Sequence, residues 1–380
     1  MPAFAGIARR LRCIDDNPRS DEQVTNANGS YNFESIREGL AMLRRKLAIV
    51  PFVGIALAFA MPRACHADDT IAPTRTPVPA AETPWIVPDI NKLPDDVWGR
   101  TVRYGRDLIA KTSSLIGPEV ADPSRRFAGN NLDCQSCHIK AGTKQFGLPL
   151  IGVYADFPTY SARTGRVGTM QDRIQGCMKR SMNGKLLPPN GPEMTAMLAY
   201  LKFLSTGHPV GAPTIGRGSG QMRELDRAAD PIKGRTVYAS TCAACHGSDG
   251  QGQRAGKVGD AKGYTFPPLW GPDSFNDGAG MTTLIDAANF IHSNMPDGTT
   301  WNDPTLSPED AWDVAAYIDS QSRPTMANLA RDFPNKLEKP VDMPYGPYAD
   351  GFSAEQHKFG PFAPIEAAIR KLKASEAAHK

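Results

Sequence analysis

The stretch Asp133-Cys134-Gln135-Ser136-Cys137-His138 decides the fold of this chain, and Thr241-Cys242-Ala243-Ala244-Cys245-His246 repeats its pattern in the second half. Both contain Cys-x-x-Cys-His, the attachment sequence of c-type haem. The two thiols can form thioethers with the haem vinyl groups, and the imidazole that follows can bind the iron. A zinc site would need Cys pairs with partner ligands at a characteristic spacing, and a redox-active dithiol does not require the histidine. The sequence therefore predicts two covalently bound haem c groups, with thioethers at Cys134, Cys137, Cys242 and Cys245 and iron ligands at His138 and His246.

The chain around each motif follows one plan. Helical patterns precede the motifs over residues 95–115 and 233–240, and each contains a Gly-Arg pair. Later helices are predicted over 192–204 and 307–320, each with a proline near its start and an Ala-Tyr-aliphatic step. This duplication predicts a mainly α fold with two cytochrome c-type haem domains in tandem. We expect the first domain over 68–205, a Gly/Pro-rich linker over 206–228, the second domain over 229–330 and an irregular C-terminal tail over 331–380.

Composition agrees with a globular protein. Of the 380 residues, 41% are hydrophobic and 22% are charged, which excludes a disordered, fibrous or multi-span membrane protein. The formal net charge is only +3, so nucleic acid is not an expected partner.

The first 67 residues have the pattern of a secretory signal peptide. Arg44-Arg45-Lys46 precedes an apolar run over 47–61, and Ala67 is the expected cleavage position. The run is shorter than the ~20 residues that a transmembrane helix needs, so no stable membrane span is expected. Met42 is a plausible true start, in which case residues 1–41 would not be translated. Export predicts a periplasmic location.

Each haem iron needs a sixth ligand or an open site. For the second haem the candidates are Met281, His292 and Met295. Met295 is favoured because Pro296 follows it and stiffens a loop just before the last helix of the domain, and a thioether is a common ligand of cytochrome c iron.

For the first haem the candidates are Cys177, Met178 and Met182, which precede the helix at 192–204. Cys177 is left without a disulfide partner once the four motif cysteines are assigned, which is unusual in an exported protein. Basic neighbours lower the pKa of a thiol toward the thiolate that binds iron, and here they are Arg173, Lys179 and Arg180. The residues alone leave these alternatives open.

The string Arg173-Ile174-Gln175-Gly176-Cys177-Met178-Lys179-Arg180-Ser181-Met182-Asn183-Gly184 resembles the thiosulfate dehydrogenase family, and the similarity runs from about residue 90 to 325. The resemblance implies His138 and Cys177 as ligands of the first haem. It implies His246 and Met295 for the second. Asn294 stands before Met295, so the exchange between lysine and methionine that the family also uses is not expected. The family's substrate-binding residues correspond to Arg163, Arg173 and Ser181.

The same resemblance implies a periplasmic enzyme that oxidises two thiosulfates to tetrathionate at the His/Cys haem, in a reaction that could run either way. Electrons would pass through the His/Met haem to a soluble acceptor such as a small cytochrome c or a high-potential iron–sulfur protein. Two dianions ~4 Å apart repel by roughly 16 kcal/mol at an effective dielectric constant of 20, so the site needs arginines. Alternatively, Arg163 and Arg173 pair with haem propionates. The alternative functions are a dihaem electron carrier without substrate chemistry and a sulfur-oxidation cytochrome that acts on a carrier-protein thiol.

Overall fold

The computed structural model describes residues 83–379. The predicted signal peptide therefore lies outside the described residues. None of the helices between 83 and 379 is long and apolar enough to cross a membrane.

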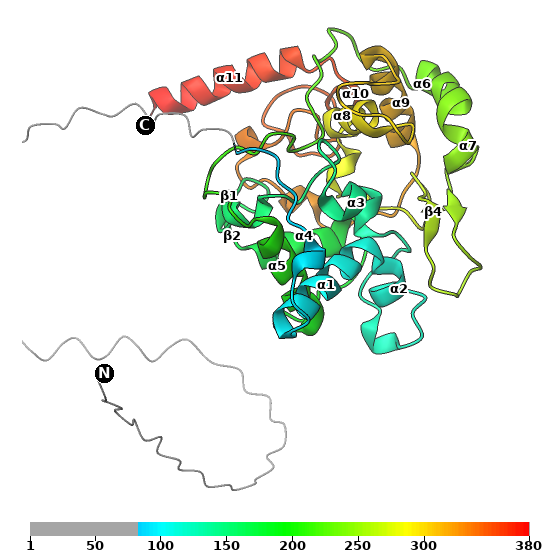
Figure 1. Ribbon diagram of the computed structural model, residues 1–380. Coiled ribbons are helices and arrows are strands. Elements are labelled where there is room, and N and C mark those ends of the chain that lie inside the picture. The colour runs from blue at the N-terminus through cyan, green and yellow to red at the C-terminus, as the bar shows by residue number, and fades with distance from the viewer. Residues whose placement is uncertain (1–82, 380) are drawn as a thin grey trace, which may run out of the picture. The chain divides into compact units, whose positions relative to one another are not determined.

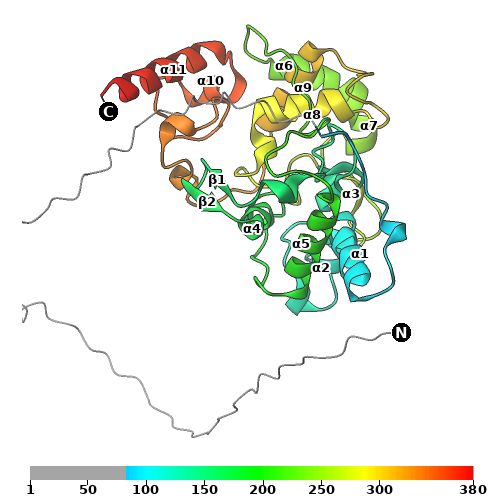
Figure 2. The ribbon, with the colours of Figure 1, turned by 60° about the vertical axis from the view of Figure 1, so that its left-hand side comes forward.

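Two crossed helices form the frame of the first domain. Helix α1 (Val97–Ala110) packs across α5 (Pro192–Leu204), as Figure 1 and Figure 2 show. A methyl group on Gly105 would overlap the backbone carbonyl of Ala196, so the glycine of the first Gly-Arg pair permits this close crossing. The helix predicted over 95–115 is two helices, because Lys111 leaves the helical conformation before α2 (Thr112–Ile116) begins.

The second domain repeats this frame. Helix α6 (Pro231–Val237) packs against α9 (Pro308–Ser320), and a methyl group on Gly234 would overlap the carbonyl of Asp313. The helix predicted over 307–320 is confirmed, and Ser307 caps it by accepting a hydrogen bond from the amide of Asp310.

Smaller elements surround these frames. The first domain adds the short helix α3 (Ile139–Gly142), the hairpin of β1 (Thr159–Ser161) and β2 (Arg166–Gly168), and helix α4 (Met170–Arg180). The second adds α7 (Ala243–His246), the antiparallel pair β3 (Gln253–Arg254) and β4 (Tyr264–Phe266), and helix α8 (Leu284–Asn294). The described part of the chain is therefore mainly helical, as the sequence predicts.

The C-terminal tail is not irregular throughout, which corrects the expectation for 331–380. After irregular chain with two short 3-10 turns, helix α10 (Ala354–Phe359) and helix α11 (Ala363–Ala378) follow. Ile365 and Ile369 of α11 are buried in the second core, and the Phe362 ring lies 5.9 Å from that of Trp312. The tail therefore completes the second core, while residues 370–378 of α11 are exposed.

The segment predicted as a linker is bonded to the first domain. Residues 206–230 contain no helix or strand. The carbonyls of Gly216 and Gly218 accept hydrogen bonds from the amides of Phe146 (2.7 Å) and Leu148 (3.1 Å). This segment therefore helps to shape the loop that follows the first Cys-x-x-Cys-His motif.

A polar network fixes the two domains to each other. Asp273 accepts hydrogen bonds from the Asn131 amide (2.9 Å) and the Tyr264 hydroxyl (2.6 Å). Arg254 binds both oxygens of Glu119, at 2.8 and 3.0 Å. All five side chains are at least partly buried, so these contacts define one relative placement of the two frames.

Candidate active site

The first motif presents His138 in one defined tautomer. Its Nδ1 lies 2.6 Å from the carbonyl oxygen of Leu148, so Nδ1 carries the proton and donates, and Nε2 remains free for a metal. Burial lowers the pKa of His138 and keeps the ring neutral. The Leu148 carbonyl is presented by backbone in the left-handed region, with φ 49°. This is the arrangement by which proteins orient a histidine that binds a metal.

The second motif repeats the arrangement. His246 Nδ1 donates to the carbonyl of Pro267 at 2.8 Å, and burial again lowers the pKa of the imidazole. The next carbonyl after this histidine, that of Gly247, accepts from the Tyr238 hydroxyl at 2.6 Å. The carbonyls of Leu148 and Pro267 therefore hold the two histidines in the same way.

A cavity of about 640 Å³ adjoins the first motif. Cys134, Cys137 and His138 line it, together with a row of side chains on α4. Arg173 and Cys177 of α4 and the C-cap residue Ser181 follow one another at four-residue intervals and so share one face. The structure therefore brings the two predicted iron ligands of the first haem, His138 and Cys177, to one cavity.

The three thiols line the same cavity. Burial raises the pKa of the Cys134 thiol to about 12 and that of the Cys137 thiol to about 11. No disulfide joins any of the cysteines between 83 and 379. Met178 and Met182, the alternative ligands, also line the cavity, and both side chains belong to the first hydrophobic core.

The second domain closes this cavity. Phe275, Ala279 and Met281 line it, and the first two are buried in the first core. Met281 packs against both cores. Met281, one of the three candidate ligands of the second haem, therefore contributes to the wall of the first site. No pattern in the sequence indicates this closure, because these residues follow the first motif by more than a hundred positions.

The donors and the lining fit a haem. Two thiols at the attachment spacing, an imidazole with a free Nε2 and a thiol on α4 adjoin one mostly apolar cavity of a size typical of ligand sites. Cys134, Cys137 and His138 could hold the first group. At the second site Cys242, Cys245 and His246 carry the same donor set.

The predicted arginines lie in different surroundings. Arg173 lines the cavity, and its guanidinium makes no ion pair or hydrogen bond within residues 83–379. Arg163 does not line the cavity. Its guanidinium donates hydrogen bonds to Asp332 at 2.9 Å and to the Tyr345 hydroxyl oxygen at 2.7 Å, and both partners lie in the C-terminal segment.

Asp332 is a site residue that the sequence analysis missed. Its second oxygen accepts from Arg180 at 2.9 Å, so one carboxylate bridges Arg163 and the last residue of α4. Tyr345 donates a further hydrogen bond at 2.7 Å, and this bond together with the charges of Arg180 and Arg163 lowers the pKa of Asp332 despite its burial. The tail therefore holds the C-terminal end of the helix that carries Cys177.

The remaining candidates for the second haem lie at the end of α8. Met295 follows this helix and is half-buried, and it packs against the second core, as Cys242 does. His292 is buried, its ring lies 5.7 Å from that of Trp301, and its Nδ1 makes no hydrogen bond within the described residues.

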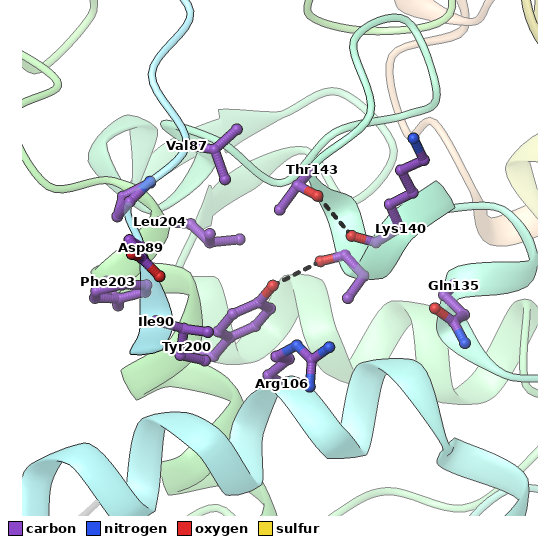
Figure 3. Close-up of a pocket in the computed structure, with 12 residues that line it drawn as sticks. Val87, Asp89, Ile90, Arg106, Gln135, Lys140, Thr143, Tyr200, Phe203 and Leu204 are labelled. Atoms are coloured by element: carbon purple, nitrogen blue, oxygen red, sulfur yellow. Dashed lines mark hydrogen bonds between the residues drawn. The ribbon is translucent and has the colours of Figure 1, made fainter. Parts of the chain in front are cut away.

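A second hollow of about 620 Å³ lies beside the first motif, where Gln135 and Lys140 line it (Figure 3). In Figure 3 the Tyr200 hydroxyl of α5 points at the turn after His138, and it donates to the carbonyl of Ala141 at 2.9 Å. The Tyr of the Ala-Tyr-aliphatic step therefore anchors the backbone that follows the first motif.

The fold and the two histidine sites define the chain as a tandem cytochrome c. Residues 125–210 match the family model described as SoxA/TsdA, cytochrome c domain, and residues 229–318 match cytochrome C oxidase, cbb3-type, subunit III. The prediction of two cytochrome c domains in tandem, with haem c as their cofactor type, is thereby confirmed.

Several similar proteins are thiosulfate dehydrogenases. That of Thiomonas intermedia is 38% identical over 69% of this chain and 79% of its own length. That of Allochromatium vinosum is 42% identical over 63% of this chain and 84% of its own. The solved thiosulfate dehydrogenase TsdBA of Marichromatium purpuratum is 35% identical with a TM-score of 0.57, over 66% of this chain and 51% of its own. This chain thus matches about half of that solved chain. It belongs to the thiosulfate dehydrogenase family.

Proposed function

We propose that this protein oxidises two thiosulfates and joins them as tetrathionate in the cavity beside His138. The observation that carries the proposal is that His138, Cys177 and the unpaired guanidinium of Arg173 line one cavity. Family membership supports thiosulfate as the substrate, because the relatives carry that activity in their names.

The proposed iron ligands are His138 and Cys177 at the first site and His246 and Met295 at the second. The hydrogen bonds from Nδ1 of His138 and His246 support their roles, since they leave Nε2 of each ring for a metal. Two covalently attached haems would each accept one electron and deliver it to an external acceptor. Thiolate ligation favours the oxidised iron and His/Met ligation the reduced iron, so the second site would have the higher potential.

Substrate binding is assigned to Arg173 and Ser181. Arg173 lies on α4 and Ser181 caps its C-terminal end, and both line the cavity together with Cys177. A guanidinium offers parallel donors to the oxygens of a sulfonate group and offsets the repulsion between two dianions. Arg163 would have to release Asp332 to reach a substrate, so its proposed contribution is indirect, through the segment that holds α4.

Cys177 is also proposed as a nucleophile. Its thiolate sulfur would form a bond with the outer sulfur of one thiosulfate, and the adduct would lose two electrons to the acceptor. The second thiosulfate would then attack the outer sulfur of the adduct, form the central S–S bond of tetrathionate and restore the Cys177 thiolate. The charges balance in both steps, because the thiolate and one dianion together lose two electrons.

The expected setting is the periplasm, after export through the signal peptide, with a small cytochrome c or a high-potential iron–sulfur protein as acceptor. This part of the proposal depends on residues 1–67.

The decisive experiment supplies thiosulfate anaerobically to the haem-loaded protein with an artificial electron acceptor. One tetrathionate per two thiosulfates is the expected product. If thiosulfate reduces neither haem and no tetrathionate forms, catalysis with free thiosulfate is excluded. An electron carrier, or an enzyme that acts on a protein-bound thiol, would then be the better explanation.

A further inference from the structure

We propose that Asn294 is a positioning residue that couples the two haem sites. It ties the distal loop of the second site, residues 294–301, to the proximal loop of the first site, residues 139–148. The distal loop contains Met295, so the inference rests on the ligand set of the proposed function. The proximal loop contains Leu148, whose carbonyl orients His138.

The side-chain amide of Asn294 joins the two domains. Only 1% of this residue is exposed, and its Nδ2 donates both to the carbonyl of Phe146 in the first domain, at 2.9 Å, and to that of Phe290 one turn earlier in α8, at 3.0 Å. Its Oδ1 is buried and makes no hydrogen bond within the described residues. Asn294 is the last residue of α8, and the amide of Met295 still bonds the carbonyl of Ile291, at 2.8 Å. The candidate ligand Met295 therefore directly follows the residue that makes the hydrogen bond between the domains.

Two further contacts join the same loops. Lys144 Nζ donates to the carbonyl of Thr299 at 2.9 Å, and the Phe146 and Trp301 rings lie 5.4 Å apart. The two loops pack closely at Gly147, where an added methyl group would lie 3.3 Å from the Asn294 Oδ1. The proximal loop of one site and the distal loop of the other therefore pack directly together.

The backbone of the proximal loop depends on these contacts. Phe146 and Leu148 both have left-handed φ values, 56° and 49°, which residues other than glycine seldom adopt. Such conformations persist when the surroundings hold them. The carbonyls of Gly216 and Gly218 hold the amides of this segment, and Asn294 holds the carbonyl of Phe146. Loss of the Asn294 bond would therefore loosen the backbone two residues before the Leu148 carbonyl.

The consequence falls on His138. Its Nδ1–H bond to Leu148, at 2.6 Å, makes the imidazole a more basic ligand, which favours oxidised iron. A weaker bond would raise the reduction potential of the first haem. The two sites would then differ less in potential, and fewer electrons would move to the second.

The test uses the full haem-loaded chain with Asn294→Leu, which keeps the size of the side chain and removes its donor. Asn289→Leu is the matched control, because Asn289 is buried on the same helix but accepts from the amide of Met222, outside the first domain. Both variants should lose stability. In spectroelectrochemical titration, Asn294→Leu should change the equilibrium between the haems about tenfold, or ~59 mV for one electron, with the first haem rising. Asn289→Leu should leave both potentials unchanged.

Lys144→Met gives a second route to the same contact if Asn294→Leu does not fold. Lys144→Met should also raise the reduction potential of the first haem, but by less than Asn294→Leu does. Potentials equal to those of Asn289→Leu in every variant that folds would overturn the coupling. The near-infrared Met–iron charge-transfer band separates this outcome from a failure of the proposed ligand set: without that band in the unmodified protein, Met295 is not the ligand and the coupling has no basis.

Discussion

Replacement of Arg173 by glutamine tests whether its guanidinium holds the substrate. A unit positive charge ~4 Å from a dianion gains roughly 2 kcal/mol in water and roughly 8 kcal/mol at an effective dielectric constant of 20. Arg173 is exposed and lines an open cavity, so the aqueous figure is the better guide. We therefore expect Arg173→Gln to lower kcat/KM for thiosulfate about 30-fold, since 1.4 kcal/mol corresponds to a factor of ten.

The assay measures initial rates with an artificial acceptor at several ionic strengths. Arg166→Gln is the matched control, because Arg166 is exposed on β2 and does not line the cavity. The deficit of Arg173→Gln relative to this control should shrink as salt rises, because salt screens exposed charges.

Two results would refute the reasoning. Equal kcat/KM for the two variants would remove Arg173 from substrate binding. A shifted reduction potential of the first haem with an unchanged KM would instead indicate that the guanidinium pairs with a haem propionate, which is the alternative that the sequence left open.

Three further predictions concern Cys177, the helix crossing and a buried carboxyl. Cys177→Gly should abolish tetrathionate formation while a haem-stained gel shows haem still attached, and substantial residual turnover would exclude a covalent role for the thiol. Gly105→Ala should lower the free energy of unfolding by ~1–3 kcal/mol or more, measured by chemical denaturation, because its methyl group meets the Ala196 carbonyl. Gly176→Ala on α4, where a methyl group would meet open space, should be neutral or stabilising. Equal changes in the free energy of unfolding would contradict the close crossing of α1 and α5. Burial and the charges of Asp286 and Glu224 raise the pKa of Asp342 to about 7, so the folded state binds the extra proton between about pH 4 and 7 and loses stability as pH rises through that range. Asp342→Asn should therefore stabilise the protein by a few kcal/mol at pH 8 and much less at pH 5, and a pH-independent difference in thermal unfolding would contradict the raised pKa.

The frames of both domains could be predicted because their signals are local. The attachment motifs carry their chemistry in five residues, and a proline at the start of a helix, or a capping residue such as Ser307, marks where α5 and α9 begin. Helices α4 and α8 were not predicted. Most of α4 is polar with only three buried side chains, and α8 is buried on nearly all sides, so neither has a clear amphipathic period.

The sequence could name candidate ligands but not what surrounds them. Its residues alone left Cys177, Met178 and Met182 open, and the family resemblance favoured Cys177. The surroundings of Arg163 could not be predicted, because Asp332 binds it from a segment that lies far along the chain. Met281 carries the thioether that a distal ligand needs, and only the packing of the two domains turns it to the first cavity.

The two domains repeat one frame, yet the first cavity is complete only when both are present. Phe275 and Ala279 belong by sequence to the second domain, and both are buried in the first core. Asn276 makes a hydrogen bond across the same boundary, since its Nδ2 donates to the carbonyl of Lys179 at 2.8 Å. The first domain alone would therefore expose the cavity that holds Cys177 and lose bonds to the end of α4. Because buried apolar contacts and hydrogen bonds both cross this boundary, duplication of a haem domain has here produced one structural unit, in which the second domain builds part of the site of the first.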